Sequence, residues 1–326
     1  MTPKTQKVVA ITAAGGPEVL QVVEREVPKP AKGEILIRVE AAGINRHDVG
    51  QRKNGPNHAK SDVPGLEVAG EIVERGPGAE EYSIGQKVCA LVDGGGYAQY
   101  AIAPASNSLP YPTGFTALEA AAIPEALFTT WYNCFTVANL KPKDRVLIHG
   151  GTSGVGTLAT QLLTSFGHEV YVTCGDDKKC AFARTLGAKA AINYRTEDFV
   201  EIVKRETGGK NVDLIIDMAG GTYASANLDA LASGGTVVHL SSGGGSYCPP
   251  LAKIMVKSAR LTGSRLRPVS IEKKAQMAAE FQARVWPLFG SKIRPVIDSV
   301  FALHEAADAH RAMERNTHIG KIMLQL

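Results

Sequence analysis

Residues 146–156, with the sequence VLIHGGTSGVG, decide the fold expected for this chain. Val146, Leu147 and Ile148 form an apolar run typical of a buried strand, and leucines recur at helical spacing in the TLATQLLTSFG that follows. A glycine- and serine-rich turn separates the two. In such a unit the glycines let the backbone approach a pyrophosphate, and the unpaired first N–H groups of the helix face the anion. The sequence therefore predicts a nucleotide-binding turn.

The glycine spacing departs from the dinucleotide pattern G-x-G-x-x-G, because the glycines stand at positions 150, 151, 154 and 156. A lone glycine-rich turn is equally compatible with an ordinary loop. The surrounding sequence favours the nucleotide turn, since further apolar strand patterns alternate with helical ones as a doubly wound parallel sheet requires. We therefore predict an α/β Rossmann domain. Its later strands are expected at residues 169–175, 190–194, 212–220, 236–241 and 257–264.

The bulk composition indicates an ordinary globular protein. At 326 residues, with 44% hydrophobic and 21% charged residues, the chain suits two domains. The net charge is only +4 and the basic residues are dispersed, so nucleic acid is not an expected partner. No apolar stretch is long enough to span a membrane and the N-terminus lacks a signal-peptide core, which favours a cytoplasmic location. Five scattered cysteines without a C-x-x-C pair favour reduced thiols over disulfides or structural zinc.

The first part of the chain has strand character punctuated by proline and glycine. Residues 33–41, GEILIRVEA, place three apolar residues on one face and Leu36 with two charged residues on the other, which is typical of a half-buried antiparallel strand. A polar loop is expected over residues 50–64. Strands at residues 65–76, 87–93 and 94–104 then complete a small twisted barrel.

After residue 110 the pattern becomes helical in two parts that break at Pro124, where we expect the chain to cross into the nucleotide domain. Residues 270–290 read as an amphipathic helix, and strand patterns at 296–303 and 321–326 bracket a last helix. The returning β character predicts a discontinuous first domain. The expected division is 1–124 with 268–326, and 125–267 between them.

Several motifs in order resemble the zinc-free quinone oxidoreductase branch of the medium-chain dehydrogenase/reductase superfamily. They cover nearly the whole chain: GGPEVL, AAGINRHD, VPGLEVAGEIVERGPG, GGGYAQY, AAAIPEA, HGGTSGVG, LGAKAAINY and HIGKIML. The resemblance implies a groES-like β-rich domain that carries the substrate site, a Rossmann domain, and a cofactor cleft between them.

The resemblance also implies an enzyme without a metal. Zinc-dependent relatives bind a catalytic zinc with cysteine, histidine and cysteine, and the matching positions here are Asn45, Leu66 and Glu125. Leucine cannot ligate zinc, and an amide with one carboxylate does not make a tetrahedral site. The lobe with four cysteines found in those relatives is missing as well. Asn45 is then either a loop-capping amide or, as the family implies, a side chain beside the nicotinamide or substrate.

Cofactor choice depends on the end of the second Rossmann strand. NAD sites usually place a carboxylate there, but this chain has Cys174 followed by Gly175. The family recognises the 2′-phosphate with a glycine, a lysine and a tyrosine, which match Gly175, Lys179 and Tyr194, so the resemblance implies NADPH. The neighbouring acids at positions 176 and 177 either oppose a phosphate or serve only as solvated helix-start acids.

Other site residues are carried over from the family one by one. Thr129 matches a threonine near the nicotinamide, with a helix-capping role and the adjacent Thr130 as alternatives. Ser153, Gly154 and Val155 are expected at the pyrophosphate or ribose. The far side of the cleft is expected to include Leu266, Arg267, His318, Gly320 and Lys321.

The resemblance implies an NADPH-dependent reductase that passes a hydride, or electrons one at a time, to a quinone. Asn45 and Arg267 would polarise or position the acceptor, and water could supply protons. Relatives place a tyrosine against the quinone within the stretch matching residues 51–62, which contains none here. Either Asn54, Asn57 or His58 fills the space, or the pocket is wider and wetter.

Two other functions stay open. One is an enone or alkenal reductase of the same fold, and the other is a non-catalytic NADPH-binding protein with a structural or RNA-binding role. We also expect a homodimer, because the apolar strand at residues 236–241 lies near the sheet edge and would invite pairing unless covered.

Overall fold

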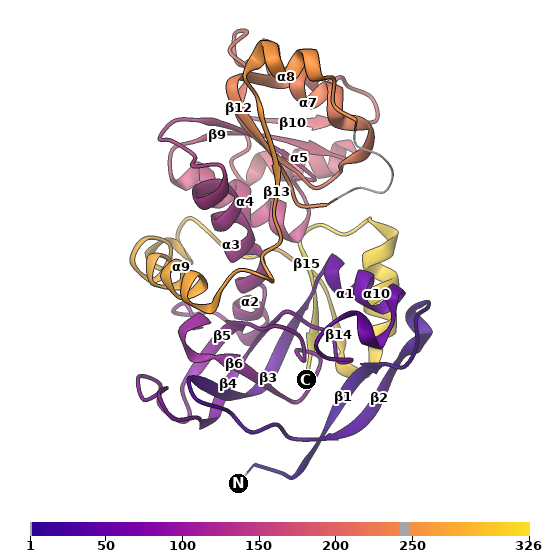
Figure 1. The fold of residues 1–326 in the computed structure, drawn as a ribbon, viewed down its shortest axis with the longest axis vertical. Helices are drawn as coiled ribbons and strands as arrows, with labels where there is room; N and C mark the ends of the chain where they lie inside the picture. Colours follow the sequence, from indigo (N-terminus) through magenta and orange to yellow (C-terminus); the bar gives the residue numbers. More distant parts are fainter. Residues whose placement is uncertain (1, 242–247) are drawn as a thin grey trace. The chain divides into compact units, whose positions relative to one another are not determined.

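The computed structural model describes residues 2–241 and 248–326. The chain divides into two compact units, one of Met1–Glu125 with Val269–Leu326 and one of Ala126–Pro268 (Figure 1). Each boundary lies one residue beyond the expected one. Within the described residues no helix is long and apolar enough to cross a membrane.

Six parallel strands form the sheet of the second unit, in the order β10-β9-β8-β11-β12-β13 (Figure 1). Numbered from β8, this is the order 3-2-1-4-5-6, and the chain reverses direction across the sheet between β8 and β11. The predicted α/β class and doubly wound sheet are confirmed. The strands are β8 (Arg145–His149), β9 (Glu169–Cys174), β10 (Ala190–Asn193), β11 (Val212–Asp217), β12 (Leu231–His239) and β13 (Arg260–Gly263).

Helices cover both faces of this sheet because side chains alternate along each strand. In β8, Val146 and Ile148 pack in a cluster with α4, whereas Leu147 packs on the opposite face with α6 and α7. Both faces are therefore apolar, as buried parallel strands require. The helices of this unit are α3 (Pro124–Trp131, continued by a π-turn at Tyr132–Val137), α4 (Gly154–Ser165), α5 (Asp177–Thr185), α6 (Phe199–Glu206), α7 (Ala224–Ala230) and α8 (Leu251–Lys257).

Two expectations for this unit are wrong in part. The strand expected at residues 257–264 begins only at Arg260, because Lys257 ends the short helix α8. The apolar strand at 236–241 is the end of β12, and β13 pairs with it in parallel, so its outer edge is covered. The two edge strands of the sheet are β10 and β13.

The first unit contains a seven-stranded sheet, in the order β14-β15-β3-β4-β5-β7 with β6 also on β3, and a separate β1-β2 pair (Figure 1). The returning chain enters this sheet through β15, which pairs antiparallel with β3. Leu36 is fully buried, so the start of β3 is covered on both faces and not on one as expected. The strands are β1 (Thr5–Ile11), β2 (Leu20–Glu26), β3 (Glu34–Ile44), β4 (Glu67–Arg75), β5 (Lys87–Leu91), β6 (Tyr100–Pro104), β7 (Ser108–Pro110), β14 (Ile297–Ala302) and β15 (Lys321–Gln325).

A helix replaces the first part of the polar loop expected over residues 50–64. Its N-terminus is closed by Asp48, whose Oδ2 accepts the Asn45 N–H at 2.8 Å, and its last turn buries Arg52 in a bidentate pair with Glu314. A short 3₁₀ turn at Pro56–His58 follows. The helices of this unit are α1 (Arg46–Asn54), α2 (Ala117–Ala121), α9 (Ile271–Arg284) and α10 (Ala306–Arg315).

Candidate functional site

Two buried charged side chains, Lys321 and Glu67, flank the half-buried Asn45 amide in the first unit. Lys321 donates from Nζ to Asn45 Oδ1 at 2.7 Å, and Asn45 Nδ2 donates to Glu67 Oε1 at 3.0 Å. Lys321 and Glu67 also form an ion pair, and both are almost completely buried. These contacts fix the orientation of the amide. Asn45 is also the N-cap residue of α1, where it forms a capping box with Asp48, so the loop-capping alternative and a place beside a ligand both stay open.

Glu67 was missed by sequence reasoning. It is the first residue of β4, and its carboxylate lies over Gly43 of β3, where an added Cβ would come within 2.1 Å of Glu67 Oε1. Glu67 Oε2 accepts the backbone N–H of Glu125 at 2.8 Å. The available signal was a carboxylate at the start of an otherwise apolar strand, opposite a glycine in the neighbouring one.

The three positions that match a zinc site do not fit a metal. Leu66 offers no ligand atom, and a Lys321 ammonium lies where Asn45 and Glu67 meet. That cation would repel a second one. Over residues 2–241 and 248–326, no group of three or more His, Cys, Asp or Glu side chains could bind a metal ion.

A second buried network continues from Asp48. Tyr97 donates its hydroxyl to Asp48 Oδ2 at 3.0 Å and lies 3.2 Å from His310 Nε2, while the Gly65 N–H reaches Asp48 Oδ1 at 3.2 Å. Burial raises the pKa of Asp48 to about 6, against the opposing effect of these hydrogen bonds. Burial also lowers the pKa of His310 to about 3. Two groups of one network thus titrate far from their ordinary ranges.

In the second unit, the predicted nucleotide turn leaves β8 at the point where the strand order reverses. The turn is closed by contacts, one with a side chain and one with backbone, that only glycine permits. A Cβ on Gly151 would lie 2.4 Å from Val172 Cβ, and one on Gly156 would lie 2.3 Å from the Gly150 carbonyl oxygen. Gly150 itself has a φ of +79°. The chain therefore builds a cradle without side chains at the start of α4, which suits a phosphate group.

Ser153 is the N-cap residue of α4 within this turn. Its Oγ caps α4 by accepting the Gly156 N–H at 3.0 Å, so the hydroxyl is engaged within the chain. In the described part of the chain, no acceptor is assigned to the N–H groups of Gly154 and Val155. These two groups are therefore the donors that the turn offers to an anion.

The end of β9 brings Gly175 close to Tyr194. A Cβ on Gly175 would lie 3.1 Å from the Tyr194 hydroxyl, so the glycine lets the half-exposed tyrosine ring approach the strand end. Asp176 caps α5 through the Lys179 N–H at 2.8 Å, and Asp177 accepts from Asn193 Nδ2 at 2.7 Å. Both carboxylates thus accept hydrogen bonds at the start of α5, which agrees with the hypothesis that they serve only as helix-start acids.

The remaining predicted residues are divided between the units. Thr129 is half-buried within α3, and its rival Thr130 is buried with its hydroxyl on the Ala126 carbonyl. Leu266 is buried and Arg267 partly exposed in the segment after β13. In the first unit, His318 is partly buried in the turn before β15, which Gly320 closes with a φ of +90°.

The segment expected to face a substrate is polar. Asn54, Asn57 and His58 are exposed, and Asn54 Nδ2 bonds to the Gly50 carbonyl at 2.8 Å. Because these three side chains are exposed, we favour a wider and more hydrated substrate pocket over one in which one of them replaces the tyrosine of relatives.

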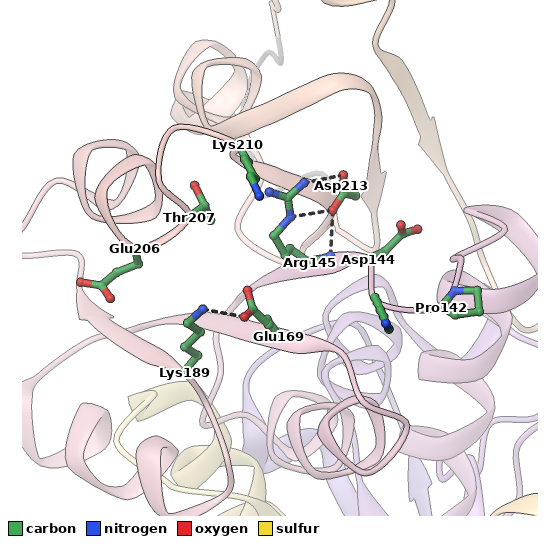
Figure 2. A pocket seen from close by; sticks show the side chains of 10 residues that line it. Pro142, Asp144, Arg145, Glu169, Lys189, Glu206, Thr207, Lys210 and Asp213 are labelled. Atoms are coloured by element: carbon green, nitrogen blue, oxygen red, sulfur yellow. Dashed lines mark hydrogen bonds and ion pairs between the residues drawn. The ribbon is translucent and has the colours of Figure 1, made fainter.

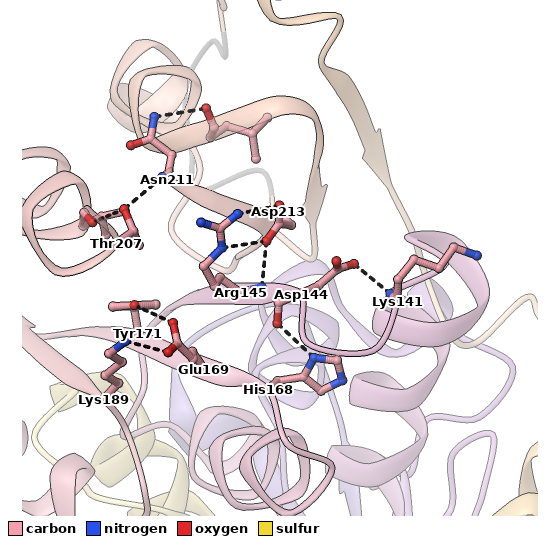
Figure 3. A network of polar contacts seen from close by, with 12 residues as sticks. Lys141, Asp144, Arg145, His168, Glu169, Tyr171, Lys189, Thr207, Asn211 and Asp213 are labelled. Carbon is pink, nitrogen blue, oxygen red and sulfur yellow. Dashed lines mark hydrogen bonds and ion pairs between the residues drawn. The ribbon is translucent and has the colours of Figure 1, made fainter. Parts of the chain in front are cut away.

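A depression of about 500 Å³ lies at the opposite end of the Rossmann sheet, where β8, β9 and β11 begin (Figure 2). Its charged groups are largely paired, since Arg145 forms a bidentate pair with Asp213 and Lys189 pairs with Glu169. The same network extends to Tyr171 and His168 and ties strand starts to loops (Figure 3). Because ligands of doubly wound sheets bind at the carboxyl ends of the strands, this depression is not the nucleotide site. It is lined by Pro142, Lys143, Asp144, Arg145, Glu169, Lys189, Glu206, Thr207, Lys210 and Asp213.

Two family models match the chain. Residues 31–113 match the alcohol dehydrogenase GroES-like domain and residues 154–284 match the zinc-binding dehydrogenase model. The quinone oxidoreductase of Sus scrofa is 30% identical over 99% of this chain and 98% of its own length. The Escherichia coli quinone oxidoreductase, solved in complex with NADPH, superimposes with a TM-score of 0.85 at 28% identity and covers 99% of this chain and 100% of its own. A structure titled NAD-dependent alcohol dehydrogenase has a TM-score of 0.87 at 30% identity, with 98% and 99% covered.

Replacing Lys321 by methionine is expected to lower the free energy of unfolding by about 3 to 5 kcal/mol, because it leaves the Glu67 carboxylate buried without its cation. The double variant Lys321→Met with Glu67→Gln removes both charges and should recover most of this loss. Urea unfolding of the wild type, both single variants and the double variant measures the coupling. Additive losses in the double variant would contradict the pairing.

The Asp48 network should be visible in the pH dependence of stability. The folded pKa of Asp48, about 6, lies above its ordinary value of 3.8, so its contribution to the free energy of unfolding is lost as pH rises through that range. The difference between these two pKa values corresponds to a change of about 3 kcal/mol in the free energy of unfolding. His310, with a folded pKa of about 3 against 6.5, gives the opposite slope.

The difference between wild type and Asp48→Asn isolates the carboxyl group. The variant should gain stability relative to wild type by about 3 kcal/mol between pH 4 and pH 7, measured by urea unfolding at each pH. His310→Gln should change the slope in the opposite sense. Parallel curves for wild type and Asp48→Asn would show that Asp48 titrates normally.

Proposed function

The chain belongs to the quinone oxidoreductase branch of the medium-chain dehydrogenase/reductase superfamily, and from this premise we propose that it is an NADPH-dependent reductase that passes hydride or single electrons to a quinone. The observation that carries the proposal is the full-length similarity to quinone oxidoreductases at about 30% identity. The glycine cradle at the strand-order reversal supports a dinucleotide as cofactor.

NADPH is the proposed cofactor, as in the similar Escherichia coli enzyme. Gly154 and Val155 would donate to the pyrophosphate, and Gly175, Lys179 and Tyr194 would surround the 2′-phosphate. The acids that could oppose this phosphate are occupied by the α5 cap and by Asn193. The remaining proposed cofactor residues are Asn45, Thr129, Ser153, Leu266, His318 and Lys321.

The cofactor supplies the hydride, so the task of the chain is to place the acceptor and exclude water. We assign positioning of the acceptor to Asn45 and Arg267. Asn45 is suited to this role because Lys321 and Glu67 fix its amide in one orientation. Water is the proposed proton source, since neither assigned residue is an acid.

Zinc independence is part of the proposal although the matching family model is named for zinc-binding dehydrogenases. It is supported by Leu66 and by the Lys321 cation beside Asn45. Turnover of a quinone with NADPH should continue in a strong chelator, and elemental analysis should find far less than one zinc per chain. One zinc per chain, with activity lost on chelation, would contradict this part of the proposal.

An α,β-unsaturated aldehyde or ketone is the second candidate acceptor, favoured by the exposed polar side chains of the segment that lacks the family's tyrosine. Parallel NADPH oxidation assays with a quinone and an enone, at matched concentrations, decide between the two. A kcat/KM at least about tenfold higher for the quinone supports the first proposal. A higher kcat/KM for the enone would instead favour the enone reductase as the function. The proposed partners do not include nucleic acid.

We propose a homodimer formed at the free edge of β13. The helix α8, which packs against the adjacent strand β12, exposes Leu251, Met255 and Val256, an apolar surface that a second copy would cover. Light scattering at micromolar concentration should give twice the chain mass, and Met255→Lys with Val256→Lys should reduce it. A monomer mass for the wild type would rule the dimer out. A cytoplasmic location is also proposed, in keeping with five free cysteines.

Cofactor preference should depend on Lys179. If its ammonium binds the 2′-phosphate, Lys179→Ala should weaken NADPH binding about 10- to 100-fold, the effect of losing about 1.5 to 3 kcal/mol, and leave NADH nearly unchanged. Fluorescence titration of both cofactors measures this. Asp176→Ser keeps a capping hydroxyl, so its combination with Asp177→Ala should change NADPH affinity only slightly. Equal affinity of the wild type for both cofactors would overturn the assignment.

A further inference from the structure

Four polar residues form a row across the carboxyl ends of the central Rossmann strands. His149 ends β8, Asp217 ends β11 and His239 ends β12, and Thr173 is the next-to-last residue of β9. Strand pairing places His149 opposite Thr173 and Asp217 opposite His239, and the β8–β11 register continues from Ile148 opposite Ile216 to His149 beside Asp217. The ends of the four adjacent strands β9, β8, β11 and β12 thus each carry a hydrogen-bonding side chain at the same level.

Asn227 of α7 joins the two halves of this row. His149 lies 3.0 Å from Thr173 Oγ1 through Nδ1 and 2.7 Å from Asn227 Oδ1 through Nε2. Asn227 Nδ2 donates to Asp217 Oδ2 at 2.9 Å, and His239 Nδ1 lies 3.2 Å from the same oxygen. Since Asn227 Oδ1 can only accept, His149 donates from Nε2, and Nδ1 accepts from the threonine. The hydrogen bonds from Thr173 to His149, from His149 to Asn227 and from Asn227 to Asp217 therefore all run in one direction, toward the carboxylate.

Asp217 also fixes the loop that follows its own strand. Its Oδ1 accepts the N–H groups of Ala219 at 2.8 Å and Gly220 at 2.7 Å. This bend places Met218 against the nucleotide turn, with its sulfur 3.8 Å from Ser153 Oγ. At the other end of the row, the Thr173 carbonyl accepts the N–H groups of Gly150 and Gly151 at 3.1 and 3.0 Å. The row thus connects the end of β9 with the turns after β8 and β11.

Placing these polar side chains at the end of the sheet costs free energy of folding. Asp217 is completely buried, and removing a carboxylate from water costs several kcal/mol before its hydrogen bonds compensate. Burial raises the pKa of Asp217, but the bonds from His239, Gly220 and Ala219 outweigh it and bring the value to about 2. Burial keeps the pKa of His149 low, in agreement with its neutral, accepting Nδ1. Apolar residues of the same size would pack there without this cost, which points to a role in position and not in stability.

We propose that Asp217 is a positioning residue for the dinucleotide: through Asn227, His149 and the Ala219–Gly220 amides it sets the geometry of the turns that bind the cofactor. The inference rests on the proposed dinucleotide site. It concerns the part of the ligand shared by NADPH and NADH, because the row lies at the turns around the strand-order reversal and not at the 2′-phosphate residues.

Fluorescence titration of Asp217→Asn with NADPH and with NADH tests the proposal. Both dissociation constants should rise about tenfold or more and by the same factor, the size of one charge-assisted hydrogen bond. The KM for NADPH should rise in parallel while kcat at saturation changes little. Lys179→Ala provides the contrast, because it should affect NADPH alone. Dissociation constants within about twofold of the wild type would overturn the inference, whereas a wild type that binds neither dinucleotide would overturn the proposed function instead.

Asp213→Asn is the matched control. Asp213 lies near the other end of the same strand, where its pair with Arg145 is partly exposed (Figure 2). This variant should lose stability but bind both dinucleotides as the wild type does. If it weakens binding as much as Asp217→Asn, general destabilisation explains the result and the inference fails.

His239 supplies a milder variant should Asp217→Asn not fold. Its side chain is 19% exposed, so water can occupy the space left in His239→Ala. This variant should weaken both dinucleotides about threefold or more, and His239→Gln, which restores an N–H donor, should recover most of the affinity. Unchanged affinity in the folded His239→Ala variant would also count against the inference.

Discussion

The close approach of the glycine backbone to its neighbours in the turn after β8 is the constraint on which the Rossmann unit depends. Gly151 packs against Val172 and Gly156 against the Gly150 carbonyl at distances that leave no room for a Cβ. These contacts bring the start of α4 directly over the end of β8, so the first helical N–H groups face outward at the strand-order reversal. The sheet around the turn then has to keep its strand ends level, because a shift of one strand would displace the cradle.

Local patterns were sufficient to predict most of the fold. The alternation of apolar strands with helical patterns gave the doubly wound sheet, and the returning strand pattern near the C-terminus is realised as β14 and β15. The errors lie where tertiary contacts decide. The helix α1 forms because Asp48 closes its N-terminus and Arg52 finds Glu314 on α10, a pairing across 262 residues. The strand order that covers β12 with β13 has no local signal either.

The candidate site divides in the same way. Motif similarity pointed to Asn45, Lys321 and the glycine turn, but it did not reveal what these residues contact. Lys321 and Asn45 are 276 positions apart in the sequence. Glu67 contacts both side chains, but it follows Leu66, the position that matches a zinc ligand in relatives, and the local sequence does not indicate these contacts. Likewise the row from Thr173 to His239 joins single polar residues from four strands, each unremarkable in its own segment. Only the strand register makes them neighbours.

The two units solve one physical problem in the same way. Each contains a side-chain amide that must present a single orientation, and an amide with one engaged end can flip at little cost. Asn45 has a cation on its oxygen and a carboxylate on its nitrogen, and Asn227 has the His149 N–H on its oxygen and the Asp217 carboxylate on its nitrogen. Flipping either amide would bring donor against donor and oxygen against anion. In low-dielectric surroundings that penalty is large, so the buried carboxylates convert a soft side chain into a rigid one.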